Sequence, residues 1–269
     1  VTPITIYPFP NFKAQRTKTY EAGVNVKLFE NKLGLDVTLY KSNTYDQLFL
    51  GTLPGGTGYS GFYAQVGNIG NKGIEASLTY NMKHNDLNYS TGLTYTLNRN
   101  KVIEMVRDYP NPVDGTSFNL TELTVDGSLI REGGQVGDIY TRSFLATDQN
   151  GKIYIDPAGN FSIVNVDNVR LGTVNPDYTL GWRNDIAYKN FNLGFMVFAR
   201  VGGIVLSQTQ ALLDQYGVSK KSAIDRDKGG IMINGGLYSD VENYYKTVAQ
   251  LEAFNTYDAT NVRLQEVSL

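Results

Sequence analysis

The segment NIGNKGIEASLTY, residues 68–80, passes from a turn rich in asparagine and glycine directly into strict alternation of apolar and polar residues. Successive side chains of a β-strand point to opposite faces of the sheet. One face of this strand is wholly apolar and the other carries only a carboxylate and hydroxyls: Ile74, Ala76, Leu78 and Tyr80 against Glu75, Ser77 and Thr79. An apolar face toward lipid and a polar face toward water are typical of the wall of a transmembrane β-barrel.

The same alternation recurs along the chain. It is found in residues 20–29, 35–40, 87–98, 178–188 and 191–201. Most of these runs approach the roughly 9 to 11 residues that a tilted strand needs to cross a bilayer. Strands of a soluble β-sandwich also alternate but are usually shorter, about 5 to 6 residues. The pattern therefore predicts an all-β fold, an antiparallel transmembrane β-barrel, over the sandwich alternative.

Alternation also predicts which side chains face lipid, because a slip of one residue would place every charge in the hydrocarbon. From the alternation we expect the following residues to face lipid: Val24, Val26, Ile74, Ala76, Leu78, Leu93 and Phe195. We expect five others to face the lumen: Asn25, Lys27, Asp36, Glu75 and Thr94.

Composition excludes several classes of protein. The 269 residues carry a formal net charge of -2, so the sequence offers no basic excess for a nucleic-acid partner. There are no cysteines, which excludes disulfides, thiol nucleophiles and cysteine-based zinc sites. No segment approaches the roughly 20 apolar residues of a membrane helix, whereas barrel strands conceal their apolar residues in alternation.

The connections between the strands alternate in length. Short turns are expected at residues 30–32, 83–86 and 189–190, and long loops at residues 47–67, 99–177 and 202–255. Outer-membrane barrels have short turns on the periplasmic side and long extracellular loops. Within the loops, Asn150-Gly151 predicts a hairpin, and residues 207–223 and 240–253 have helical character, which suggests an external cap.

Catalytic chemistry finds little support in the sequence. His84 is the only histidine and lies in a short polar turn, without a partner for a triad or a metal site. Asp148, Asn150 and Asp156 resemble half of a calcium loop, although the spacing and the terminal glutamate are incomplete. Hairpin chemistry explains the same three residues. We therefore predict no catalytic residues, no metal ligands and no cofactor, and loop calcium remains the alternative.

Several segments resemble one known family, the SusC/RagA-like TonB-linked outer-membrane transporters. The matching segments occur in the family's order: residues 18–23 (KTYEAG), 29–40 (FENKLGLDVTLY), 68–75 (NIGNKGIE), 98–102 (NRNKV) and 172–178 (GTVNPDY). The third segment is the most specific, although it is two residues shorter at its centre than the family pattern.

This resemblance implies a TonB-dependent importer of oligosaccharides or peptides, multi-pass in the bacterial outer membrane. It implies a 22-stranded barrel, an N-terminal plug and a SusD-like surface lipoprotein as an external lid. Residues 1–269 would then be an incomplete part of the barrel domain, without plug, TonB box or final strands. The alternative function is a soluble all-β carbohydrate-binding or adhesion module; an outer-membrane enzyme is disfavoured by the residue inventory.

Candidate contact residues lie in a glycine-rich stretch of the first long loop. Tyr59, Phe62 and Tyr63 offer aromatic faces that suit a partner surface or a sugar ring. The competing interpretation is that these aromatics pack against neighbouring loops.

Overall fold

The structure is a computed structural model that describes residues 6–7, 12–52, 58–110, 116–125 and 127–269. It divides into two compact units, each of which is described by itself. Unit 1 comprises Val1–Asp138, Thr173–Gly203 and Ala259–Leu269, and unit 2 comprises Ile139–Gly172 and Ile204–Asp258. Within the described ranges, no helix is long and apolar enough to cross a membrane.

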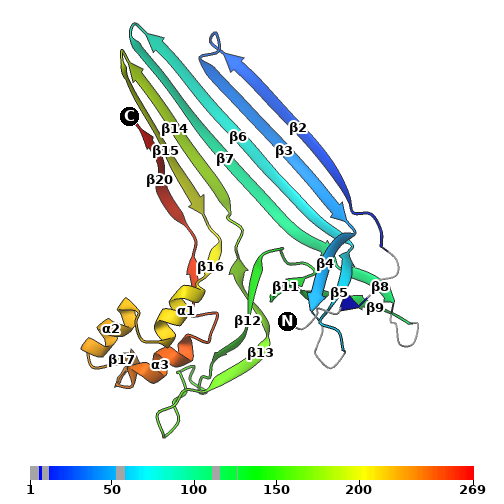
Figure 1. Ribbon diagram of the computed structural model, residues 1–269, viewed down its shortest axis with the longest axis vertical. Coiled ribbons are helices and arrows are strands. Elements are labelled where there is room, and N and C mark those ends of the chain that lie inside the picture. Colours follow the sequence, from blue (N-terminus) through cyan, green and yellow to red (C-terminus); the bar gives the residue numbers. More distant parts are fainter. Residues whose placement is uncertain (1–5, 8–11, 53–57, 111–115, 126) are drawn as a thin grey trace. The chain divides into compact units, whose positions relative to one another are not determined.

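An open sheet of seven strands dominates unit 1 (Figure 1). In order across the sheet, the strands are β2 (Arg16–Leu28), β3 (Leu33–Tyr45), β6 (Asn68–His84), β7 (Leu87–Glu104), β14 (Tyr178–Tyr188), β15 (Phe191–Val201) and β20 (Asn261–Ser268). Each neighbouring pair is antiparallel, and the spatial order follows the chain. This up-and-down order confirms the predicted all-β, antiparallel fold.

The pairing register confirms the predicted division into two faces. One row of directly opposed residues is apolar across the whole sheet: Val26, Leu35, Leu78, Leu93, Trp182, Val197 and Leu264. The neighbouring row, on the opposite face, holds Asn25, Asp36, Ser77 and Thr94. We call the face that bears Leu78 the apolar face and the one that bears Ser77 the polar face. All residues predicted to face lipid share the apolar face.

Strands β6 and β7 are longer than the sequence pattern predicts. They contain 17 and 18 residues, whereas the sequence predicts a turn that leads into alternation over residues 74–80, and alternation over residues 87–98. Pairing continues beyond the alternating residues through a largely polar stretch, as far as Asn68 opposite Glu104. Backbone hydrogen bonds do not depend on apolar side chains, so the pattern detects only the apolar part of each strand.

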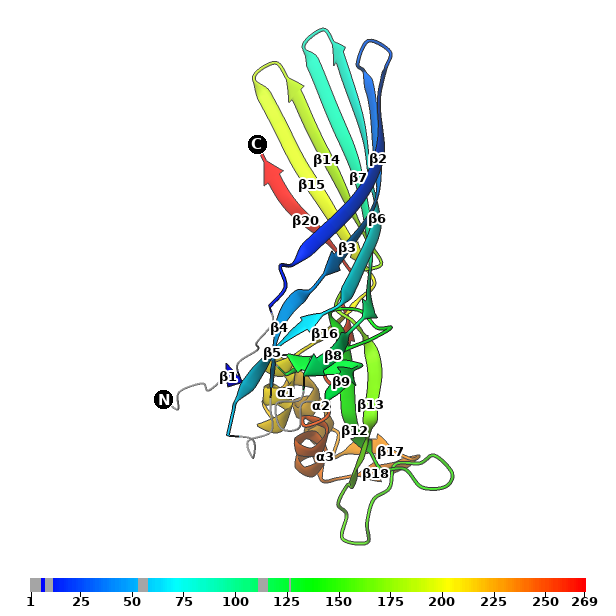
Figure 2. The same cartoon turned by 90° about the vertical axis from the view of Figure 1, so that its right-hand side faces the viewer.

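Three short turns lie together at one end of the sheet, at residues 29–32, 85–86 and 189–190 (Figure 2). Each contains a residue other than glycine at positive φ: Asn31 at 67°, Asn85 at 50° and Lys189 at 51°. These turns match the predicted ones. We call this the turn end of the sheet and the opposite end the loop end.

Short strands at the loop end complete unit 1. They are β1 (Ile6–Tyr7), β4 (Gln47–Thr52), β5 (Gly61–Val66), β8 (Val106–Pro110), β9 (Ser117–Leu120), β10 (Glu122–Val125) and β11 (Ser128–Arg131). Their buried side chains form a core with residues from β6, from β7 and with Met105, which lies between β7 and β8: Phe62, Ala64, Val66, Ile69, Val102, Met105, Val106, Tyr109, Leu123 and Ile130. The predicted long loops of residues 47–67 and 99–177 are therefore built largely from strands.

Unit 2 is a small mixed unit with its own core. Its strands are β12 (Asp138–Leu145, of which Asp138 belongs to unit 1), β13 (Ile163–Thr173, of which Thr173 belongs to unit 1), β16 (Ile204–Leu206), β17 (Ile231–Ile233), β18 (Gly236–Tyr238) and β19 (Thr256–Asp258). Its helices are α1 (Gln208–Gln215), α2 (Lys220–Asp227) and α3 (Val241–Val248). The buried core consists of Leu145, Val241, Tyr245, Val248 and Leu251.

The two predicted helical segments of unit 2 are present, but the first is divided. Residues 216–219 separate α1 from α2, and Gly217 adopts a φ of 66° there. Ser219 then begins a new helix by accepting a hydrogen bond from the Ser222 amide at 3.1 Å. A run with helical character thus folds as two short helices.

Candidate functional site

Three of the sequence motifs meet at the loop end of the sheet. The Asn71 side-chain oxygen accepts hydrogen bonds from the amides of Asn98 at 3.3 Å and Asn100 at 3.0 Å. The Asn100 oxygen in turn accepts the backbone N–H of Val136 at 2.8 Å. These asparagines connect β6 and β7 to the segment that leads toward unit 2.

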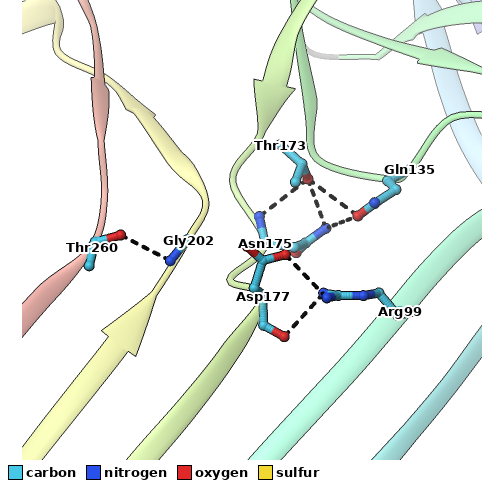
Figure 3. A network of polar contacts seen from close by, with 7 residues as sticks. All are labelled: Arg99, Gln135, Thr173, Asn175, Asp177, Gly202 and Thr260. Atoms are coloured by element: carbon cyan, nitrogen blue, oxygen red, sulfur yellow. Dashed lines mark hydrogen bonds and ion pairs between the residues drawn. The ribbon is translucent and has the colours of Figure 1, made fainter.

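A second polar cluster closes the place where the chain leaves unit 1 and returns (Figure 3). The amide of Asn175 donates to the Val136 carbonyl at 2.8 Å and to the Thr173 hydroxyl at 3.2 Å, and it lies 3.5 Å from the Gln135 oxygen. The backbone N–H of Val174 donates to the Gly137 carbonyl at 2.8 Å. The chain therefore leaves after Asp138 and returns at Thr173 through a hydrogen-bonded neck.

Arg99 connects this neck to the wall. Its guanidinium lies 3.2 Å from the Asp177 carboxylate and donates to the Asp177 carbonyl at 3.1 Å. The two side chains are 40% and 62% exposed, so water screens the ion pair, and its contribution to stability is at most about 1 kcal/mol. Arg99 therefore positions the start of β14 more than it stabilises the unit.

A second neck lies beside the first. The N–H of Ala259 donates to the Gly203 carbonyl at 3.0 Å, and the N–H of Gly202 donates to the Thr260 hydroxyl at 3.0 Å. The Arg200 guanidinium donates to the Val174 carbonyl and so joins the two necks. We call the residues drawn in Figure 3 the loop root: Arg99, Gln135, Thr173, Asn175, Asp177, Gly202 and Thr260.

Gly202 has no room for a side chain. Its φ is 76°, and a Cβ atom there would overlap the carboxylate of Asp177. We expect Gly202→Ala to cost about 1 to 2 kcal/mol from the left-handed backbone. It should cost about 1 kcal/mol more because Asp177 must turn away from Arg99. Amide hydrogen exchange at the loop root in the full-length protein measures both losses.

Gly133→Ala is the matched control for this prediction. Gly133 has a φ of 85° and nothing within 4 Å of an added Cβ, so only the backbone cost applies. In an Asp177→Ala background, where the ion pair is already absent, Gly202→Ala should cost only the backbone contribution when it is compared with Asp177→Ala alone. Equal losses of protection in the two single variants would contradict the proposed overlap.

The three predicted contact residues pack against neighbouring aromatic rings to different extents. Phe62 and Tyr63 belong to strand β5, which corrects their placement in a loop, and Phe62 is only 9% exposed. The Phe62 ring packs edge-on against Tyr109, with ring centres 5.7 Å apart. Tyr59 and Tyr63 are half-buried, and their rings lie 5.2 Å from Tyr7 and 5.8 Å from Phe12. Their role in contacting a ligand stays a prediction.

The aspartates of the half calcium loop act in two successive turns of unit 2. The Asp148 carboxylate accepts the N–H groups of Asn150 at 2.8 Å and Lys152 at 2.9 Å, and Asp156 accepts the N–H of Asn160 at 2.7 Å. The Lys152 amide holds the pKa of Asp148 below its usual range, and the Asn160 amide does the same for the pKa of Asp156. Asn150-Gly151 forms the predicted turn. Calcium binding here stays a prediction.

The described residues contain no group of three or more histidine, cysteine, aspartate or glutamate side chains placed to hold a metal ion. His84 lies at the turn end, 3.5 Å from the Asn85 amide. What the loop root can do chemically is to hold together, within unit 1, the chain segments at which the two insertions begin and end, through neutral hydrogen bonds and one ion pair.

Sequence reasoning missed the loop root as a site. The motifs at residues 98–102 and 172–178 carried the resemblance, but no contact between them was predicted. Gln135 lies in a long segment without a repeating pattern, so nothing marked it. The run of polar residues directly before β14 was the one available signal.

Comparisons with known proteins identify what this chain is similar to. The family model described as "TonB dependent receptor-like, beta-barrel" matches residues 2–201. TonB-dependent receptor P3 of Formosa agariphila is 28% identical over 98% of this chain, which spans 28% of that protein. TonB-dependent receptor P26 of the same organism is 26% identical over 69% of this chain, which spans 20% of its length.

Solved structures share the fold. The structure of the RagAB peptide transporter matches with a TM-score of 0.64 and 17% identity over 94% of this chain and 28% of that chain. The RagAB peptide importer in its closed-closed state matches with a TM-score of 0.63 at the same identity and coverage. At this identity the likeness concerns the fold alone.

Proposed function

Because this chain belongs to the TonB dependent receptor-like β-barrel family, we propose that it forms part of the wall and outer loops of a nutrient importer in the outer membrane. The family consists of receptors and transporters rather than enzymes. Energy would come from TonB, which would act through parts of the protein other than residues 1–269. The apolar face of the seven-stranded sheet is the observation that carries the proposal.

Lipid accounts for that face better than water does. Leu78, Leu93 and Leu264 share a row and are 40%, 48% and 62% exposed. Fully burying a leucine contributes about 1.5 to 3 kcal/mol, and a continuous apolar face of this size is rare on soluble proteins. A soluble carbohydrate-binding or adhesion module would have to cover these side chains with a second layer. In a barrel, the hydrocarbon chains of the membrane cover these side chains, and no second layer of protein is needed.

Oligosaccharides and peptides are the substrates we propose, with a SusD-like lipoprotein as the external lid. The solved structures with the same fold are described as a peptide importer, which favours peptides. Tyr59 and Tyr63 keep accessible ring surface and are proposed to contact the lid or the substrate. Phe62 supports their hairpin from the core side.

We propose that the outer segments rather than the wall hold the lid, with residues 204–258 as a further candidate, and excision of residues 204–258 tests this. Gly203 and Ala259 are hydrogen-bonded at 3.0 Å, so an Asn-Gly turn can join them in the full-length transporter. We expect the barrel to insert normally, because the wall is untouched. Affinity for the lid should fall by about thirty-fold or more, as expected when a hot-spot cluster worth about 2 kcal/mol is removed.

Membrane insertion, lid co-purification and substrate uptake are the three readouts. An insertion of the same two residues at the turn between Lys189 and Asn190 is the control, and it should change none of them. A variant that lacks residues 204–258 but keeps its lid and imports at the parental rate would remove this segment from the proposal. Failure of the parental protein to insert would instead argue against the importer itself.

A further inference from the structure

Five cations lie on the apolar face of the sheet at its loop end. The register places Tyr20, Lys41, Lys72 and Arg99 in one row across β2, β3, β6 and β7. This row directly follows the apolar row of Ala22, Leu39, Ile74 and Leu97. The next row outward holds Lys18 and Lys101. We call Lys18, Lys41, Lys72, Arg99 and Lys101 the basic band.

Carboxylates at this level of the sheet lie on the polar face, where Arg200 shares the row of Glu75. No carboxylate belongs to the two rows of the basic band within the described strands, whereas Glu21 and Glu75 both lie on the polar face. The chain has a formal net charge of -2, so the concentration of cations does not follow from its composition. On the apolar face, the basic band is therefore a concentration of positive charge that no carboxylate of the same two rows balances.

The central pair of the band lacks a neutralising partner. Lys41 and Lys72 are exposed, lie directly opposite each other, and form no ion pair with any residue in the described part of the chain. Adjacent strands are about 4.8 Å apart, and like charges directly opposite on neighbouring strands destabilise the pair. A bound anion would relieve this repulsion. Arg99, by contrast, is already held by Asp177 at 3.2 Å.

We propose that the basic band binds the phosphate-bearing headgroups of lipids in the outer leaflet. This inference rests on the proposed function, which places the apolar face in lipid and the loop end outside the cell. Lysine stems can lie along Leu39 and Ile74 while their ammonium groups reach the headgroup level. Tyr20, which is 72% exposed in the same row, has the amphipathic ring that such interfaces favour.

Lipid retention in the full-length transporter tests the proposal. The protein is reconstituted in vesicles of phosphatidylcholine with phosphatidylglycerol, partly delipidated, and the two retained lipids are counted by native mass spectrometry. The parental protein should retain phosphatidylglycerol preferentially. The double variant Lys41→Gln/Lys72→Gln should lose about five-fold in this preference per lysine. Higher salt should weaken the parental preference as well.

Lys27→Gln/Lys83→Gln is the matched control, because it removes the same charge from the polar face. It should leave the preference unchanged. Equal preference in the parental protein and Lys41→Gln/Lys72→Gln, or an equal loss in both double variants, would overturn the lipid site while leaving the importer intact. A parental protein that is soluble without detergent and retains neither lipid would overturn the membrane assignment and the lipid site together.

Discussion

Arginine in place of Leu78 should destabilise the inserted barrel by about 2 to 4 kcal/mol, the cost of this charge on the lipid face at the bilayer midplane. Leu78 lies midway along β6 between Lys72 of the basic band and His84 at the turn end, and it is directly opposite Leu35 and Leu93. The charge would therefore enter the middle of the apolar rows. Denaturant titration of the full-length protein in lipid vesicles measures this change in the free energy of unfolding.

Ser77→Arg is the internal control for this prediction. Ser77 is the adjacent residue but lies on the polar face, opposite Asp36 and Thr94. Arginine there reaches water and the Asp36 carboxylate, so its cost should be far smaller. If the two variants lost similar stability, the assignment of faces would be wrong, and with it the membrane-spanning sheet.

Much of the wall could be predicted from the sequence, because a sheet with lipid on one side imposes a two-residue period on every strand. Strands β14 and β15 begin and end at the predicted residues, 178–188 and 191–201. The loop-end parts of β3, β6 and β7 were missed because polar residues and glycines occupy most of their positions on both faces, with Ile69, Val102 and Ile103 as exceptions. Alternation disappears there while backbone pairing continues.

The candidate site could not be predicted in the same way. Asn175 reaches Val136 across 39 positions of sequence, and Arg99 reaches Asp177 across 78. Such contacts join residues that only the complete fold brings together, and no local sequence pattern predicts them. Phe62 illustrates the reverse problem, since an aromatic residue near glycines suits either a ligand or a core. Only the packing against Tyr109 distinguishes these alternatives.

Tyr245 anchors the core of unit 2. Its side chain is 2% exposed among Leu145, Val241, Val248 and Leu251, and its hydroxyl donates to the Asp225 carboxylate at 2.6 Å. Burial, together with the hydrogen bond and charge of Asp225, raises the pKa of Tyr245 far above its ordinary value. The hydroxyl therefore remains a hydrogen-bond donor throughout the physiological range of pH. This contact ties α3 to α2.

Tyr245→Ala should accordingly destabilise unit 2 by about 3 to 5 kcal/mol, the usual cost of removing a large buried aromatic side chain. Tyr245→Phe should cost only about 1 kcal/mol, because the half-exposed Asp225 can bind water instead. Amide exchange and limited proteolysis across residues 204–258 of the full-length protein measure both effects. Tyr216→Ala, at a position 73% exposed, should change neither.

Tyr245→Ala should affect unit 2 without affecting the wall. Because Tyr245 lies in unit 2 and the apolar face lies in unit 1, Tyr245→Ala should leave membrane insertion unchanged while proteolysis within residues 204–258 increases. If the folded insertion holds the lid, Tyr245→Ala should also lose lid binding, and Tyr216→Ala should keep it. Normal lid binding by a protein whose unit 2 has demonstrably unfolded would place the lid contact in unit 1, with Tyr59 and Tyr63 as the next residues to replace.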